Sequence, residues 1–195
     1  MDRVTIYTDG SCHGNPGPGG YAAILLHKNS TKEVHGSDWY TTNNRMELKA
    51  VIEGLRMLTQ PSEATIITDS QYIAKTINRG NLRAFVNTPG RKNADLWEQV
   101  MRLAEWHTIK AQWVRGHSGN KLNQRCDAIA NREASLLEKE KKTRLIVFSE
   151  LLKDVTITAE EIARQYKCGL NTVEKYYYQF FDRYAAENGG ATNAE

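Results

Sequence analysis

The sequence predicts an α/β fold in which a five-stranded mixed sheet is flanked by helices and followed by a small all-helical C-terminal appendage. The first observation behind this prediction lies in residues 4–26, where two apolar, β-type runs are separated by the glycine- and proline-rich stretch 15–20, a tight reversal. The second is the spacing of apolar residues, which changes from a strand period to a helical period after Tyr40 and alternates between the two periods thereafter. The whole chain then has the order βββ-α-β-α-α-β-α. This order predicts an antiparallel meander joined to helix-connected parallel strands.

Each element after the hairpin has its own signal. Leu48, Val51 and Leu55 recur at helical spacing, and Pro61 ends that helix. Ser70 follows a short apolar strand and is a typical helix cap. The expected elements are a strand over 32–40, a helix ending before Pro61, a strand over 64–68, a helix over 71–77, a basic loop or short helical segment over 78–92, a helix over 95–106, a strand over 109–114 and a long helix from about Leu122.

Acidic residues stand where these elements meet. Asp9 and Asp69 each follow an apolar strand, and βαβ connectivity sets those strands parallel and adjacent, so their carboxylates should emerge together. Glu47 lies near a helix start, at the border of the buried stripe, and Asp127 lies in the first turns of the last helix. A turn-capping role explains Asp9 equally well when its own stretch is taken alone. All four acids together predict one cluster.

Such a cluster needs either raised pKa values or bound cations, because like charges repel at short distance. Carboxylate oxygens select Mg²⁺ or Mn²⁺ over zinc. Two such ions about 4 Å apart can activate a water and stabilise the leaving oxygen of a phosphodiester.

Length and composition restrict the possible domain organisation and the possible partners. A chain of 195 residues accommodates one large domain plus an appendage, and its formal charge of +3 becomes distinctly basic once four acids are set aside, which suits a phosphate-rich partner. Three widely spaced cysteines argue against a disulfide framework and a zinc site. Neither a targeting segment nor a membrane span is visible, so we expect a soluble, cytoplasmic protein.

Five ordered motifs over roughly residues 1–140 resemble bacterial type 1 ribonuclease H. They are Thr8-Asp9-Gly10-Ser11-Cys12 with the turn 14–20, Thr42-Asn43-Asn44-Arg45-Met46-Glu47-Leu48, Thr68-Asp69-Ser70-Gln71-Tyr72, Val114-Arg115-Gly116-His117 and Asn123-Gln124-Arg125-Cys126-Asp127. The resemblance implies a ribonuclease H-like fold. It also implies an endonuclease that hydrolyses the RNA strand of RNA–DNA hybrids with two Mg²⁺ ions, for which Mn²⁺ can substitute, leaving a 5′-phosphate and a 3′-hydroxyl.

The resemblance also assigns roles by position. Asp9, Glu47, Asp69 and Asp127 would be the catalytic, metal-binding acids, and His117 would assist proton transfer or product release from a mobile loop. The residues expected to line the hybrid groove are Gly10, Cys12, Asn15, Asn43, Asn44 and Gln71. Taken without the resemblance, His117 is better explained as an exposed loop histidine, and Asn15 and Asn44 as turn and cap residues.

One departure from the family lies between Asp69 and Asp95, where the segment that should form a basic handle is short. Its charge comes from Arg79, Arg83, Arg91 and Lys92, and its aromatic face from Phe85. The resemblance therefore does not extend to a stacking platform for the DNA strand.

The second departure is the appendage. We expect a catalytic domain over 1–142, a helical appendage over 143–187 that resembles a helix-turn-helix, and a disordered tail over 188–195. From residue 143 onwards, six Lys and Arg face eight Asp and Glu, a net charge of −2, which is unfavourable for a DNA-binding unit. Its many aromatic residues fit either contact with nucleic acid or a protein, or packing of a small core.

Two other functions stay open on the sequence alone. One is a DNA-cutting nuclease of the same fold, such as a resolvase or an integrase, and the other is a non-catalytic hybrid-binding module. The intact set of acids disfavours the module.

Overall fold

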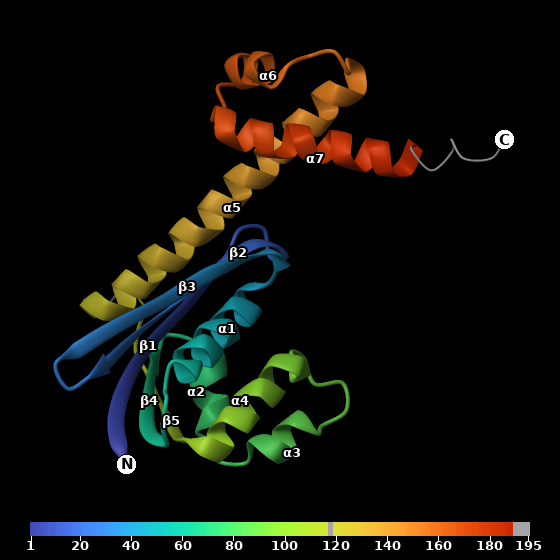
Figure 1. Cartoon of the computed structure of the whole chain (residues 1–195). Helices are drawn as coiled ribbons and strands as arrows, with labels where there is room; N and C mark the ends of the chain where they lie inside the picture. Colours follow the sequence, from blue (N-terminus) through green and yellow to red (C-terminus); the bar gives the residue numbers. More distant parts are fainter. Residues whose placement is uncertain (117–118, 189–195) are drawn as a thin grey trace. The chain divides into compact units, whose positions relative to one another are not determined.

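The computed structural model describes residues 1–116 and 119–188 and contains a five-stranded mixed sheet in the order β3-β2-β1-β4-β5 (Figure 1). The strands are β1 (Asp2–Cys12), β2 (Gly17–His27), β3 (Ser30–Thr41), β4 (Ser62–Thr68) and β5 (Thr108–Trp113). The first three form an antiparallel meander, whereas β4 runs parallel to both β1 and β5. The predicted fold class is confirmed.

Seven helices occur in the described part of the chain. They are α1 (Asn43–Arg56), α2 (Gln71–Ile77), α3 (Leu82–Val86), α4 (Ala94–Trp106), α5 (Lys121–Lys153), α6 (Ala159–Tyr166) and α7 (Leu170–Asn188). The segment expected to be a basic loop or short helix contains α3, whose first turn is capped by the Asn81 side chain accepting from the Ala84 N–H. None of these helices is long and apolar enough to span a membrane.

The chain divides into two compact units, Met1–Leu137 and Glu138–Glu195. Helix α5 continues without a break from the first unit into the second. A domain boundary after Lys142 therefore stays a prediction, and the tail predicted to be disordered lies outside the described residues apart from Asn188.

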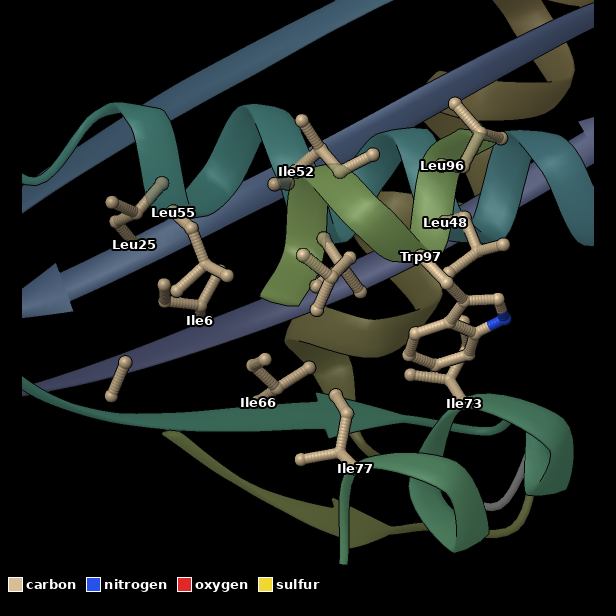
Figure 2. Packing of buried hydrophobic residues seen from close by; sticks show 14 of the residues in the cluster. Ile6, Leu25, Leu48, Ile52, Leu55, Ile66, Ile73, Ile77, Leu96 and Trp97 are labelled. Atoms are coloured by element: carbon tan, nitrogen blue, oxygen red, sulfur yellow. The ribbon is translucent and has the colours of Figure 1, made fainter. Parts of the chain in front are cut away.

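The main core of the first unit lies between one face of the sheet and helices α1, α2 and α4. Figure 2 shows Ile6 and Ile66 from neighbouring strands in the same cluster as Leu48 of α1 and Trp97 of α4. Trp97 is fully buried, and its Nε1 donates to the Tyr72 hydroxyl at 2.6 Å. This satisfied indole fixes α2 against α4, so the end of β4 is held on a rigid scaffold.

The opposite face of the sheet is covered by the first half of α5. Ala22 and Ile24 of β2 pack there against Cys126 and Ala130. Residues of one strand thus alternate between two cores, and this alternation fixes which side each strand residue faces.

The second unit has its own small core of Val147, Leu151, Ile162, Val173 and Tyr176. Helix α6 begins with a capping box, in which the Thr158 side chain accepts from the Glu161 N–H and the Glu161 side chain accepts from the Thr158 N–H. The predicted all-helical appendage is therefore confirmed.

Candidate metal centre

Asp9 and Asp69 lie side by side because their strands are parallel neighbours. The β1–β4 register pairs Tyr7 with Ile67, two residues before each aspartate. The backbone carbonyl of Asp69 also accepts a hydrogen bond from Trp113 Nε1 at 2.8 Å, which ties the end of β4 to β5. The predicted convergence of these two carboxylates is present.

Glu47 reaches the same place because α1 begins directly against β1 at Gly10. A Cβ at Gly10 would lie 2.3 Å from the backbone nitrogen of Glu47 and 2.4 Å from the carbonyl carbon of Met46. Only glycine allows this close approach. Gly10 thus has a packing role, and it also donates its N–H to Asp9 Oδ1 at 2.7 Å.

The three acids offer carboxylate oxygens that all lie within 4.8 Å of one another. Asp9 is 5% exposed and Glu47 6% exposed, while Asp69 is half-buried. Glu47 Oε2 is buried and has no hydrogen-bond partner among the described residues. An unsatisfied oxygen on a buried carboxylate that is clustered with two other acids is costly unless a cation binds there.

The pKa values of these acids reflect this crowding. Burial, together with the nearby charges of Asp69 and Asp127, raises the pKa of Asp9 to about 8. Burial also raises the pKa of Glu47 well above its usual value, and the charge of Asp9 adds to the effect. In the absence of cations, the native fold therefore favours the protonated form of both groups.

The donor set fits a hard divalent cation. It consists of carboxylate oxygens without cysteine or histidine among the clustered residues, which favours Mg²⁺ or Mn²⁺ over zinc. A bound cation at this point would favour the ionised form of each acid, and the unpaired Glu47 oxygen could coordinate it.

Asp127 stands at the edge of the cluster. Its charge is close enough to raise the pKa of Asp9 and of Glu47, but it is outside the set within 4.8 Å. Asn131, one helical turn later, donates from Nδ2 to Asp127 Oδ1 at 2.6 Å, and Ser11 Oγ donates to Asn131 Oδ1 at 2.7 Å. This relay from β1 to α5 orients Asp127.

Sequence reasoning missed both members of this relay. The spacing of Asp127 and Asn131, four residues apart on a helix, was an available signal, because such residues are neighbours on one helical face. Ser11 belongs to a strand far away in sequence, so its partner could not be inferred locally.

The predicted His117 lies outside the described residues. The residue before it is next to the cluster, because a Cβ at Gly116 would lie 2.8 Å from Asp69 Oδ2. The loop that leads to His117 therefore starts beside one of the acids.

The predicted groove residues lie around the starts of α1 and α2. Asn15 Oδ1 accepts from the Asn43 N–H at 3.0 Å, so Asn15 has the cap role that was open for it. The half-buried Cys12 thiol donates to the Thr41 carbonyl at 3.3 Å. Asn44 is exposed in the first turn of α1, and Gln71 is exposed at the start of α2, where it accepts from Lys75.

An open, basic pocket of about 540 Å³ adjoins Gln71, between α2, α3 and the loop before α4. Its cations are Lys75, Arg79, Arg91 and Lys92, and none of its described lining residues is acidic. Phe85 is only 8% exposed, packs edge-on against Trp97 and lies 4.1 Å under the Arg91 guanidinium. It therefore offers little stacking surface, as expected from the shortened segment.

Comparison with known proteins identifies the family to which this fold belongs. The RNase H family model matches residues 1–135, more than half of the chain. The chain belongs to the RNase H family. The enzyme class predicted from the motifs, a ribonuclease H and thus a phosphodiester hydrolase, is confirmed.

Individual relatives agree with this family. The ribonuclease H of Pelobacter propionicus is 49% identical over 133 residues, which are 65% of this chain and 82% of that protein. The solved structure of LC9-RNase H1, a type 1 RNase H with the type 2 active-site motif, has a TM-score of 0.60 and 28% identity, covering 69% of this chain and 73% of its own. LC11-RNase H1 in complex with RNA/DNA hybrid shares the fold with a TM-score of 0.53 and 21% identity, covering 68% of this chain and 96% of its own.

The raised pKa of Asp9 predicts a pH-dependent stability. When folding raises the pKa of an acid, the native state has its full stability at pH values below the ordinary pKa of that acid, and it loses stability as the pH rises through about 8. Without divalent metal, Asp9→Asn should therefore raise the melting temperature. The increase should be larger at pH 8.5 than at pH 5.5 by about 3 °C or more. Thermal unfolding followed by circular dichroism in EDTA measures this.

Asp95→Asn is the matched control. Arg45 lowers the pKa of Asp95, so Asp95 is ionised at both pH values and its loss should lower the melting temperature equally at both. An Asp9→Asn effect that is the same at pH 5.5 and pH 8.5 would contradict the crowded, buried cluster.

The relay to Asp127 gives a second prediction. Asn131→Ala removes the Nδ2 hydrogen bond that helps to orient the Asp127 carboxylate, so Mg²⁺ affinity measured by isothermal titration calorimetry should fall about 10-fold. Ser11→Ala should have a smaller effect in the same direction. The double variant should be no weaker than Asn131→Ala alone, because the relay is already broken, whereas additive losses would show that the two residues act separately.

Proposed function

We propose that this chain is an endonuclease that hydrolyses the RNA strand of RNA–DNA hybrids with two Mg²⁺ ions, which Mn²⁺ can replace. The observation that carries the proposal is the buried Glu47 carboxylate, whose Oε2 has no partner among the described residues and which clusters with Asp9 and Asp69 so that one oxygen of each acid lies within 4.8 Å of the others. Membership of the RNase H family and a relative crystallised with an RNA/DNA hybrid support the choice of substrate.

The proposed ligands are Asp9, Glu47, Asp69 and Asp127. Bound divalent ions would activate a water and stabilise the leaving oxygen of the phosphodiester. Asp9 is oriented by the Gly10 N–H, Asp69 by its place at the end of β4, and Asp127 by Asn131. Their geometry is therefore set before substrate binds, which reduces the cost of assembling the site. His117, which follows Gly116 in the sequence, would assist proton transfer or product release, and the products would carry a 5′-phosphate and a 3′-hydroxyl.

The proposed hybrid groove runs past Gly10, Cys12, Asn15, Asn43, Asn44 and Gln71. Asn15 uses its carbonyl oxygen to fix the start of α1, which leaves its amide NH₂ to donate to a 2′-hydroxyl or a base edge. Asn43 and Asn44 are exposed on the same helix start. Amides suit this role because they both donate and accept in the wide minor groove of a hybrid.

The basic pocket beside Gln71 would take a phosphate of the DNA strand. Lys75, Arg79 and Lys92 supply donors there, whereas Arg91 is partly used in packing on Phe85. This pocket would hold the backbone electrostatically and without base stacking, since Phe85 is buried. We also place the protein in the cytoplasm, because Cys12, Cys126 and Cys168 are free thiols.

The test is cleavage of end-labelled duplexes of one sequence, as RNA–DNA hybrid, double-stranded RNA and double-stranded DNA, with Mg²⁺ or Mn²⁺. We expect cleavage of the RNA strand of the hybrid alone. Asp9→Asn should lower kcat by about 10³-fold, because metal-assisted stabilisation of the reacting phosphate amounts to several kcal/mol. Glu63→Gln, an exposed acid of β4 paired with Arg3, should leave the rate unchanged.

Two results would contradict the proposal. Equal cleavage of duplex DNA would indicate a DNA-cutting nuclease of the same fold. Tight binding of the hybrid without cleavage would indicate a non-catalytic binding module.

A further inference from the structure

Helices α6 and α7 of the second unit are joined by a sharp turn of three residues, Lys167 to Gly169 (Figure 1). Lys167 has a φ of 52° and ends α6 in the left-handed conformation. The Cys168 N–H then donates to the Ala163 carbonyl at 3.0 Å, which closes the end of α6. A short helix, a three-residue turn and a longer helix form the pattern of a helix-turn-helix.

Packing fixes the inner face of α7. Val173 and Tyr176 are buried against Ile162 of α6 and against Val147 and Leu151 of α5. Because these contacts occupy one side of α7, its opposite side points to solvent along the first three turns.

That outer side carries Asn171, Lys175 and Tyr178, at positions i, i+4 and i+7 on one helical face. Tyr178 is 63% exposed and the Lys175 side chain 60% exposed. An amide, a cation and an aromatic hydroxyl extend here over about 10 Å of helix. Such groups donate and accept hydrogen bonds at base edges and bind phosphates. This face is therefore polar and chemically suited to a nucleic-acid groove.

The charges around this face are of both signs, which weakens the expected binding to nucleic acid. Arg164 and Lys167 are exposed at the turn and add cations at the start of α7. Glu174 flanks the face and Glu160 lies in the first turn of α6, so the gain from phosphate contacts is partly cancelled. Lys175 is paired with the half-buried Glu140, which also accepts from the Tyr176 hydroxyl, so a phosphate must compete with this pair for the Lys175 ammonium. We expect weak binding with a shallow dependence on salt.

We propose that the outer face of α7, through Asn171, Lys175 and Tyr178, docks in the major groove of B-form duplex DNA. The B-form major groove is wide enough to admit a helix, whereas the A-form groove of RNA is deep and narrow. The partner of this face is therefore duplex DNA that flanks a hybrid. Such contact raises the local concentration of the nuclease at hybrid–duplex junctions.

The experiment uses the full chain in EDTA and a fluorescein-labelled 24-base-pair DNA duplex, with anisotropy as the readout. The test variant is Lys175→Gln/Tyr178→Ala. The control variant is Lys153→Gln/Leu145→Ala, which removes another exposed, ion-paired lysine and a side chain of nearly equal exposure, 62%. We expect the test variant to raise Kd about 10-fold and to lower the slope of log Kd against log salt by about 1, with the control like wild type.

Two substrates distinguish an effect of the variant on DNA docking from an effect on the catalytic centre. A short hybrid without flanking duplex should be cleaved by wild type and test variant at the same kcat and KM. A hybrid flanked by duplex DNA should show a raised KM for the test variant alone. Asn171→Asp, which changes only an exposed position, should weaken DNA binding in the same direction, so loss of folding in the double variant cannot decide the result.

Three outcomes would overturn the proposal. Equal Kd values for wild type, test and control would show that α7 does not contact DNA. Competition by double-stranded RNA as strong as by DNA would exclude groove docking of the proposed kind. Self-association of the wild type that the test variant abolishes would show that the face binds a second copy of the chain.

Discussion

The close contact between Gly10 and the start of α1 is the constraint on which the rest of the site depends. It brings the Glu47 backbone within reach of β1, and so places a second buried carboxylate against Asp9. The neighbouring strand β4 supplies Asp69 through its parallel register. Once these three are assembled, the native fold holds like charges together, and only protonation or a bound cation can relieve their repulsion.

The scaffold keeps this unfavourable arrangement in place. Trp97 of α4 packs edge-on against Tyr72 of α2 and Phe85 of α3, and the meander is packed on both faces, by α1 and by α5. Because these cores are close-packed, the acids cannot separate to lower their mutual repulsion. The repulsion among the acids lowers the stability of the metal-free native state. A cation that binds only the native state relieves this repulsion and stabilises the fold.

Much of this could be predicted from the sequence, because periodicity and chain order determine the strands that carry Asp9 and Asp69. Other features depend on contacts that no local pattern contains. The packing role of Gly10 requires a helix 36 residues away in the chain, at Met46, and the Ser11–Asn131 relay joins β1 to α5. The continuity of α5 past Lys142 follows from the charged residues there, which are good helix formers and do not end a helix. Phe85 was proposed as an aromatic face, but Trp97 draws it into the core.

The central claim, that the acids form a divalent-cation site, is tested most directly by Mg²⁺-dependent thermal unfolding of wild type, Glu47→Gln and the control Glu63→Gln. At ten times Kd, Mg²⁺ should stabilise wild type and control by about 1.4 kcal/mol, a rise of about 3–5 °C in melting temperature. The rise should be much smaller in Glu47→Gln, which removes the buried, unpaired ligand oxygen. Equal rises in all three proteins would contradict the account.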